Sequence, residues 1–293
     1  MPAHILFHYR FVKLASVGLV MLMTVLFVAL RAFGDAADDF LTSGKAMAAK
    51  GDWDAALADC SKAIELKPGF AEAYDSRGWA RQSKGDVDGA LVDYEKCLQI
   101  NPAFFAAYND RAIAKQMKGD ADGALADLDK AIELNAKFFG AYYSRGRVKQ
   151  SKNDFNGAMA DYTKAIELKP DYFQAYDSRG ILKSVQSDFK GAIADYNKAV
   201  ELNPKNVKAY SNRGIAKFYT GDLEGALTDY NSAIDLSPTA FQPYLNRGIV
   251  KSKMGDVGGA QADFSKATEL NPGAQKLIEA QGYSMSGTSN SKP

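Results

Sequence analysis

The chain has 293 residues, of which 36 are Lys or Arg and 35 are Asp or Glu, so its formal net charge is +1. This balance argues against a surface built to bind a polyphosphate such as nucleic acid. Two cysteines are too few for a disulfide-dense scaffold or a four-cysteine zinc site, and both histidines, His4 and His8, lie among the first ten residues. The rest of the sequence therefore has no imidazole for acid–base catalysis or metal binding.

The N-terminal segment, residues 1–34, is predicted to be a signal peptide or a membrane anchor. Arg10 and Lys13 precede the 17 uncharged residues 14–30, the order of regions found in an export signal. Small residues at Ala32 and Gly34 fit a cleavage site directly after Gly34, and Gly34 with Ala36 gives a second option. An uncleaved anchor is the alternative, although 17 helical residues span only about 26 Å of a hydrocarbon core of about 30 Å; a buried apolar helix is a third possibility. With either a signal or an anchor, we expect the chain from about residue 35 to be exported, either periplasmic or secreted after cleavage or tethered outside the cytoplasm.

An internal repeat organises the rest of the sequence. The dipeptide Arg-Gly recurs at residues 145, 179, 213 and 247, at intervals of 34 residues. Blocks of this length fill residues 37–274 without a gap: 37–70, 71–104, 105–138, 139–172, 173–206, 207–240 and 241–274. Positions within each block run from 1 to 34.

Each block is predicted to contain two helices, A and B. Position 4 is aromatic, position 8 is Gly or Ala, position 20 is always Ala, and position 24 is large in six blocks, all at helical spacings. Position 16 is Asp in every block, a strong N-cap that marks the start of helix B, and the residue before it is Gly, Asn or Ser, which suits a turn with positive φ. Pro at position 32 of six blocks ends helix B. The small residues should let the two helices approach closely beside the large side chain at position 24.

This pattern resembles the tetratricopeptide repeat family in its aromatic residues at positions 4 and 24, its small residues at 8, 20 and 27, and its Pro at 32. The resemblance covers 238 of the 293 residues. It implies an all-α fold, a right-handed superhelical solenoid of antiparallel helix pairs in seven repeats, because neighbouring repeats must stack to bury their apolar faces. Residues 275–282 are predicted to be a partial capping helix, and residues 283–293 a disordered tail.

Two positions depart from the family pattern and form a basic stripe. Position 7 is Arg and position 11 is Arg or Lys in six blocks, while position 23 is Asp in all seven. We expect a structural salt-bridge ladder paired across blocks, for example Arg77 with Asp59 and Arg111 with Asp93, with the Lys at position 26 competing for the same carboxylate; an anion-binding track is the alternative. The predicted ladder residues are Arg77, Arg111, Arg145, Arg179, Arg213, Arg247, Asp59, Asp93, Asp127, Asp161, Asp195 and Asp229.

The resemblance also implies a binding groove, because helix A lines the concave side of such a solenoid. An apolar line at position 9, fringed by amides and hydroxyls, suits an extended peptide or a helix; the aromatic residues along it are either anchors for a partner or packing against the next repeat. The candidate groove residues are Trp79, Gln82, Ile113, Gln116, Met117, Tyr143, Arg147, Gln150, Ile181, Ile215, Phe218, Tyr219 and Ile249. No block has the Lys at position 5 or the Asn at position 9 with which some family members grip a C-terminal carboxylate.

The sequence has no recognisable catalytic or metal-binding motif, so we expect neither enzymatic activity nor a cofactor. Cys60 and Cys97 are predicted to be small buried core residues rather than a disulfide. The predicted function is a non-catalytic scaffold or adaptor that binds a peptide or helix of a protein partner. A helical-repeat RNA-binding protein and a regulatory fragment of an enzyme are the alternatives; the net charge of −2 that remains without residues 1–34 (33 basic against 35 acidic) opposes the first.

Overall fold

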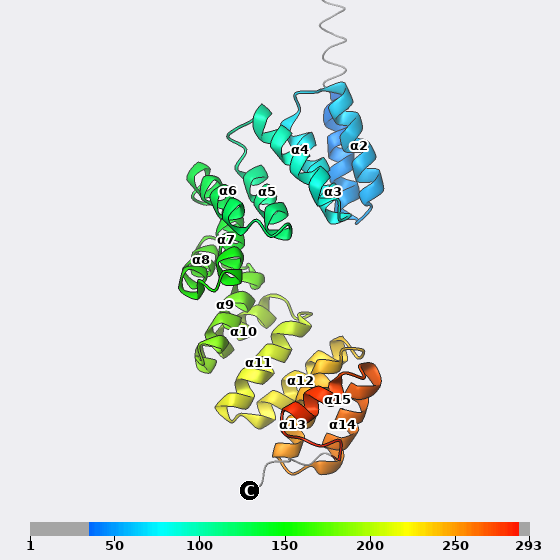
Figure 1. The fold of residues 1–293 in the computed structure, drawn as a ribbon, viewed down its shortest axis with the longest axis vertical. Helices are drawn as coiled ribbons and strands as arrows, with labels where there is room; N and C mark the ends of the chain where they lie inside the picture. The colour runs from blue at the N-terminus through cyan, green and yellow to red at the C-terminus, as the bar shows by residue number, and fades with distance from the viewer. Residues whose placement is uncertain (1–34, 287–293) are drawn as a thin grey trace, which may run out of the picture. The chain divides into compact units, whose positions relative to one another are not determined.

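The computed structural model describes residues 35–286. The predicted leader and most of the predicted tail lie outside these residues. Every regular element of the described region is helical (Figure 1), and no helix within it is long and apolar enough to cross a membrane.

The helices alternate along the chain as the A and B helices of the 34-residue blocks, starting with helical residues 35–49. The B helices are α2 (Trp53–Leu66), α4 (Val87–Ile100), α6 (Ala121–Leu134), α8 (Phe155–Leu168), α10 (Phe189–Leu202), α12 (Leu223–Leu236) and α14 (Val257–Leu270). The following A helices are α3 (Ala71–Ser83), α5 (Phe105–Met117), α7 (Phe139–Ser151), α9 (Phe173–Val185), α11 (Val207–Thr220) and α13 (Phe241–Lys253), and α15 (Ala274–Ala280) comes last. The all-α fold of stacked helix pairs is confirmed; the number of repeats and the right-handed superhelix stay predictions.

The start of each B helix follows the predicted chemistry. The Asp at position 16 is the N-cap of all seven B helices, and its carboxylate accepts a hydrogen bond from the backbone N–H three residues later. The residue before it has positive φ in every block, including the two non-glycine residues, Asn153 at 63° and Ser187 at 62°. This left-handed residue turns the chain from helix A into helix B, and the aspartate then satisfies one of the free N–H groups at the helix start.

Helices A and B of one block touch where a small residue faces a large one. A Cβ built at Gly78 on α3 would lie 2.8 Å from Cε1 of Tyr94 on α4, so no larger residue fits there without movement. Gly146, Gly180, Gly214 and Gly248 face their own aromatic residues in the same way, at 2.6–2.8 Å. The buried side chains at position 24 and the alanines at position 20 thus form the core of each pair. Cys60 and Cys97 are buried and unpaired in this core, as predicted.

The salt bridges join the two helices of one block, so the predicted pairing across blocks is wrong. Arg77 donates from Nε and Nη2 to the carboxylate of Asp93, at 2.9 and 2.7 Å, and not to Asp59. Position 7 of helix A faces position 23 of the helix B that follows, and Asp59 instead accepts a hydrogen bond from Ser43 at 2.6 Å. The six pairs are Arg77–Asp93, Arg111–Asp127, Arg145–Asp161, Arg179–Asp195, Arg213–Asp229 and Arg247–Asp263.

The basic residue at position 11 is the second salt-bridge partner of the aspartate at position 23. Lys217 Nζ lies 3.0 Å from Asp229 Oδ2, and Arg81, Lys115, Lys149, Lys183 and Lys251 reach their own aspartates at 2.8–2.9 Å. The Lys at position 26 does not compete: in five blocks it pairs with the Glu at position 29 of its own exposed helix turn. Neighbouring blocks are linked through the remaining guanidinium nitrogen instead, since Arg213 Nη1 donates to Asn197 of the preceding block at 2.9 Å.

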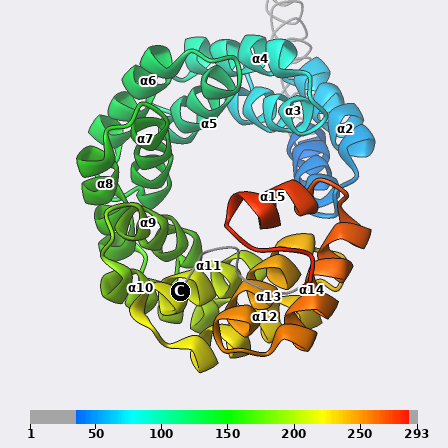
Figure 2. The same cartoon turned by 60° about the horizontal axis from the view of Figure 1, so that its bottom comes forward.

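The described helices form two compact units, one ending at Ser144 and the other starting at Arg145. In the first unit, consecutive helices from α2 to α6 are in contact, and α3 also contacts α5. In the second unit α9 contacts both α10 and α11, and α11 also contacts α13. Within each unit the A helices lie next to one another on one face and the B helices on the other (Figure 2). The A-helix face is therefore the surface on which side chains from successive blocks come together.

Candidate functional site: a pocket between α9, α10 and α11

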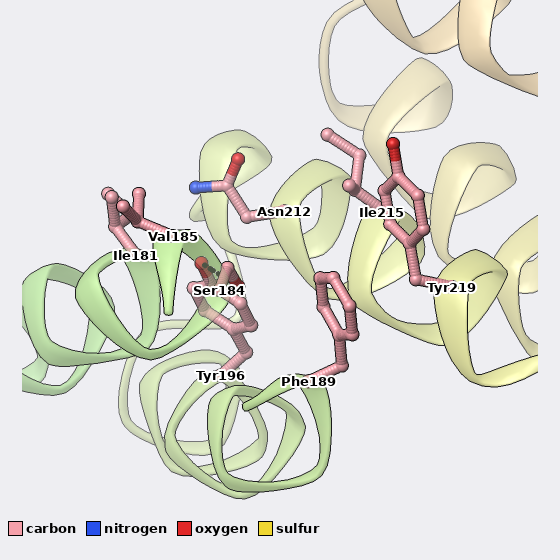
Figure 3. Close-up of a pocket in the computed structure, with 8 residues that line it drawn as sticks. All are labelled: Ile181, Ser184, Val185, Phe189, Tyr196, Asn212, Ile215 and Tyr219. Atoms are coloured by element: carbon pink, nitrogen blue, oxygen red, sulfur yellow. Dashed lines mark hydrogen bonds between the residues drawn. The ribbon is translucent and has the colours of Figure 1, made fainter. Parts of the chain in front are cut away.

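A pocket of about 320 Å³ opens on the second unit (Figure 3). Two A helices and the B helix between them form it. Its lining residues are Ile181, Ser184 and Val185 of α9, Phe189 and Tyr196 of α10, and Asn212, Ile215 and Tyr219 of α11.

One wall of the pocket is an aromatic stack. The rings of Phe189 and Tyr219 are nearly parallel, at 11°, with their centroids 4.8 Å apart. Tyr219 is nevertheless 63% exposed, and Val185 across the pocket is 60% exposed (Figure 3). Large apolar side chains held open to solvent around a concavity are typical of a surface that contacts a partner.

A few polar side chains lie at the base of the pocket. The hydroxyls of Tyr196 and Ser184 lie 3.4 Å apart, close enough to share a hydrogen bond. Burial raises the pKa of Tyr196 to about 12, so its phenol stays protonated at neutral pH. Asn212 hydrogen bonds to the carboxylate of Asp177, whose pKa is raised by burial. The pocket thus combines apolar walls with a few uncharged groups that can pair with polar atoms of a ligand.

A smaller pocket, of about 140 Å³, continues along the same face of this unit. It shares Ile215 and Tyr219 with the larger pocket, so these two side chains form the ridge between them. Its other lining residues are Phe218, Tyr230, Asn246, Ile249 and Gln281. Lys253 places its ammonium 4.6 Å from the centroid of the Phe218 ring.

The structure brings five of the thirteen predicted groove residues to these two pockets: Ile181, Ile215, Phe218, Tyr219 and Ile249. It does not bring the others there. Trp79, Gln82, Ile113, Gln116, Met117 and Tyr143 belong to the first unit, while Arg147 and Gln150 lie earlier in the second.

Among the predicted residues outside the pockets, some already have partners within the chain. Trp79 packs edge-on against Trp53, with their centroids 5.1 Å apart, and remains 42% exposed. Gln82 and Gln150 accept hydrogen bonds from the hydroxyls of Tyr94 and Tyr162, at 3.2 and 2.6 Å. These amides therefore hold the core tyrosines in place.

Several lining residues were not among those predicted from the sequence. Ser184 and Val185 occupy positions 12 and 13, and Asn212 occupies position 6, all of which face the groove in the family, so the register alone could have found them. Phe189 gave a weaker signal, because it lies at position 17 on a B helix, outside the surface expected to line a groove.

A third pocket, of about 440 Å³, lies in the first unit and is lined in part by residues of the basic stripe. Arg111 and Lys115 line that pocket, but both already contact Asp127, at 2.6 and 2.8 Å. The described residues contain no group of three or more His, Cys, Asp or Glu side chains placed to hold a metal ion.

Stacked helix pairs with an open A-helix face define a helical repeat protein. A family model described as Tetratricopeptide repeat matches residues 71–104, 139–172 and 241–273, and one described as TPR repeat matches residues 186–220 and 216–255. The chain belongs to the tetratricopeptide repeat family. This fold serves protein–protein interaction in general and is typically a non-catalytic scaffold. No curated protein matches the chain significantly.

Several solved structures are similar to the chain. A tetratricopeptide repeat protein of Parabacteroides merdae is 20% identical with a TM-score of 0.58, over 84% of this chain and 98% of its own. YrrB, described as a TPR protein with an unusual peptide-binding site, is 23% identical with a TM-score of 0.56, over 64% of this chain and 96% of its own. PilF of Pseudomonas aeruginosa is 16% identical with a TM-score of 0.65, over 72% of this chain and 96% of its own. These likenesses concern the fold alone.

Proposed function

We propose that this protein is a non-catalytic scaffold or adaptor, and that the pocket between α9, α10 and α11 holds an apolar side chain of a peptide or helix of its partner. The observation that carries the proposal is the aromatic stack of Phe189 on Tyr219, which stays exposed beside a preformed concavity. Tyr is among the residues enriched where a few side chains contribute most of the binding energy of a protein interface.

The shape of the pocket fits one large apolar group rather than a small polar metabolite. Its volume, about 320 Å³, lies at the lower end of ligand sites, and most of its lining is aliphatic or aromatic. The amide of Asn212 and the hydroxyl of Ser184 supply hydrogen bonds to the main chain or a polar edge of the same segment. The second, smaller pocket beyond Ile215 then holds a further side chain of that segment.

A partner of the protein class is further supported by the family, and YrrB offers a relative of the same fold that is described as binding peptide. RNA binding and a regulatory fragment of an enzyme remain the other classes considered, and no feature of the described residues favours either. We also propose export of the chain from about residue 35, on the basic and apolar composition of residues 1–34. N-terminal sequencing of the matured chain tests cleavage: a start near residue 35 supports it, and a start at Met1 contradicts it.

The experiment that tests the proposed pocket is photo-cross-linking in the native cell. A photoreactive amino acid replaces Val185 on the pocket rim or, as the control, Lys198 on the exposed side of α10. We expect a distinct cross-linked partner segment from residue 185 that disappears when Ile215→Arg is added, and no such product from residue 198. Equal products from both positions, or a product at residue 185 that Ile215→Arg leaves intact, would contradict the proposal.

A further inference from the structure

Two acidic side chains meet on the A-helix face of the first unit. Asp75 of α3 and Asp110 of α5 lie where these two helices contact each other, and the charge of Asp110 acts directly on Asp75. Both residues keep a part of their surface exposed, so a ligand can reach the pair. In no other two consecutive blocks is position 5 of the first block Asp and position 6 of the second block also Asp.

No basic side chain of the described residues is in direct contact with this carboxylate pair. Within residues 35–286 neither Asp75 nor Asp110 forms an ion pair, although each ladder aspartate, such as Asp93, contacts two basic side chains. Lys45, in helical residues 35–49, is the basic group that acts on Asp75, and its ammonium pairs with Glu72 at 3.5 Å. Two half-buried carboxylates without a cation in contact are costly, because burial removes part of their hydration and their charges repel each other.

The hydrogen bonds around the pair leave acceptors unused. Asp75 Oδ1 is buried and has no hydrogen-bond partner, and neither has Oδ1 of Asn109. The amide nitrogen of Asn109 donates to Asp110 at 3.0 Å and is the one donor seen on that carboxylate. A buried polar atom without a partner costs free energy. What the site lacks is therefore a donor with positive charge.

We propose that the Asp75–Asp110 pair binds a cationic side chain, lysine or arginine, of a protein partner. The proposal rests on the proposed protein-binding function but uses residues of the other unit. An ammonium group brings three donors and a guanidinium five, enough to satisfy the unused oxygens and to neutralise the pair. A divalent metal fits less well, since Ca²⁺ takes six to eight oxygen ligands and no metal cluster occurs in this region.

A proton takes the place of the cation when the site is empty. Burial first, and then the charge of Asp110, raises the pKa of Asp75 to about 8, and burial raises that of Asp110 to about 6. The other titratable groups that face the pair are Lys45, Glu72 and, from α4, Tyr94 and Cys97. Burial raises the pKa of both α4 groups, so they stay neutral while the pair titrates. A cation must displace the proton of Asp75, so its affinity should increase as the pH rises toward 8.

The test uses n-butylammonium, an analogue of the lysine side chain, with n-butanol as the neutral control. Carbon-13 NMR of the carboxyl groups of the full chain follows its binding at pH 6 and at pH 8.5. We expect saturable shifts of the Asp75 and Asp110 signals with the amine, at least about tenfold tighter at pH 8.5, and none with n-butanol. Asp75→Asn should abolish the pH dependence and weaken binding at least about tenfold, while Asp54→Asn, at an exposed carboxylate, should change neither.

Two results would overturn the proposal. One is amine binding that Asp75→Asn does not weaken, which means non-specific attraction to surface acids. The other is a pair that titrates but takes up no amine at either pH, which means a site for a proton alone. Ile215→Arg in the other unit should leave amine binding intact. The experiment therefore distinguishes a failure of the proposed partner-binding pocket from a failure of the proposed cation site.

Discussion

The glycine at position 8 offers a sharp test of how the helices of one block pack. In Gly214→Ala the new Cβ would lie 2.8 Å from Cε1 and 3.0 Å from Cζ of Tyr230, which is 2% exposed and cannot swing away. The third block shows how the sequence accommodates Ala at this position, because Ala112 there occurs together with the smaller Leu128. We therefore expect Gly214→Ala to be tolerated only when Tyr230 is replaced as well.

The expected magnitude follows from two opposing effects. Overpacking a well-filled core costs about 1–3 kcal/mol, and replacing Gly by Ala inside a helix returns about 1 kcal/mol. Gly214→Ala alone should therefore lower the free energy of unfolding by up to about 2 kcal/mol. In the Tyr230→Leu background, where the ring no longer occupies the space, the same change should be neutral or stabilising by up to about 1 kcal/mol. The two substitutions are therefore coupled by the overpacking cost, about 1–3 kcal/mol.

The assay is hydrogen exchange of the α11 and α12 amides in the wild type, the two single variants and the double variant, because a repeat protein can unfold in parts. Urea unfolding followed by circular dichroism gives the matching global values. An equal effect of Gly214→Ala in both backgrounds, or a wild-type chain stabilised by it, would refute the close approach of the two helices.

Three further predictions concern the ladder, the acidic pair and the caps. Arg213→Met should lower the free energy of unfolding in urea by about 2–3 kcal/mol and Lys217→Met by about 1 kcal/mol. The reason is that Asp229, which is 1% exposed, loses its bidentate partner only in the first variant. Equal costs would argue against this geometry. The folded state holds the proton of Asp75 up to a pKa of about 8, whereas the unfolded chain loses it near 4, so the melting temperature should fall as the pH rises from 5 to 9. Asp75→Asn should flatten that slope, and an unchanged slope would contradict the assignment. Asp222→Ala removes the carboxylate that accepts the N–H of Gly225 at 2.9 Å and should cost about 1 kcal/mol by the same unfolding assay, with a negligible cost excluding a capping role.

The local features of the fold could be predicted from the sequence because their causes are local. The N-cap carboxylate acts within three residues and the positive-φ residue just before it fixes the turn, so Asp222 and its counterparts mark the start of each B helix. The small residue at position 8 and the large one at position 24 recur together, which is enough to predict that the two helices meet there.

The partners of the ladder could not be predicted, and the reason is the repeat itself. Arg77 stands 16 residues before Asp93 and 18 residues after Asp59, and both distances recur in the other blocks, so the sequence pattern fits either pairing. Only the packing of the helices decides between them. The pocket was predicted in part, because Ile181, Ile215 and Tyr219 follow the A-helix register, while the stack of Phe189 on Tyr219 depends on how α10 packs beside α11.

Binding of a partner in the pocket between α9, α10 and α11 is tested most directly by a calorimetric titration with the segment that cross-links at residue 185. We expect Ile215→Arg to weaken the affinity at least about 30-fold, the effect of losing an interface residue worth about 2 kcal/mol. Lys266→Ala, on the exposed side of α14, is the matched control and should bind as the wild type does. An affinity that Ile215→Arg leaves within about twofold of the wild-type value would show that the partner does not bind in this pocket.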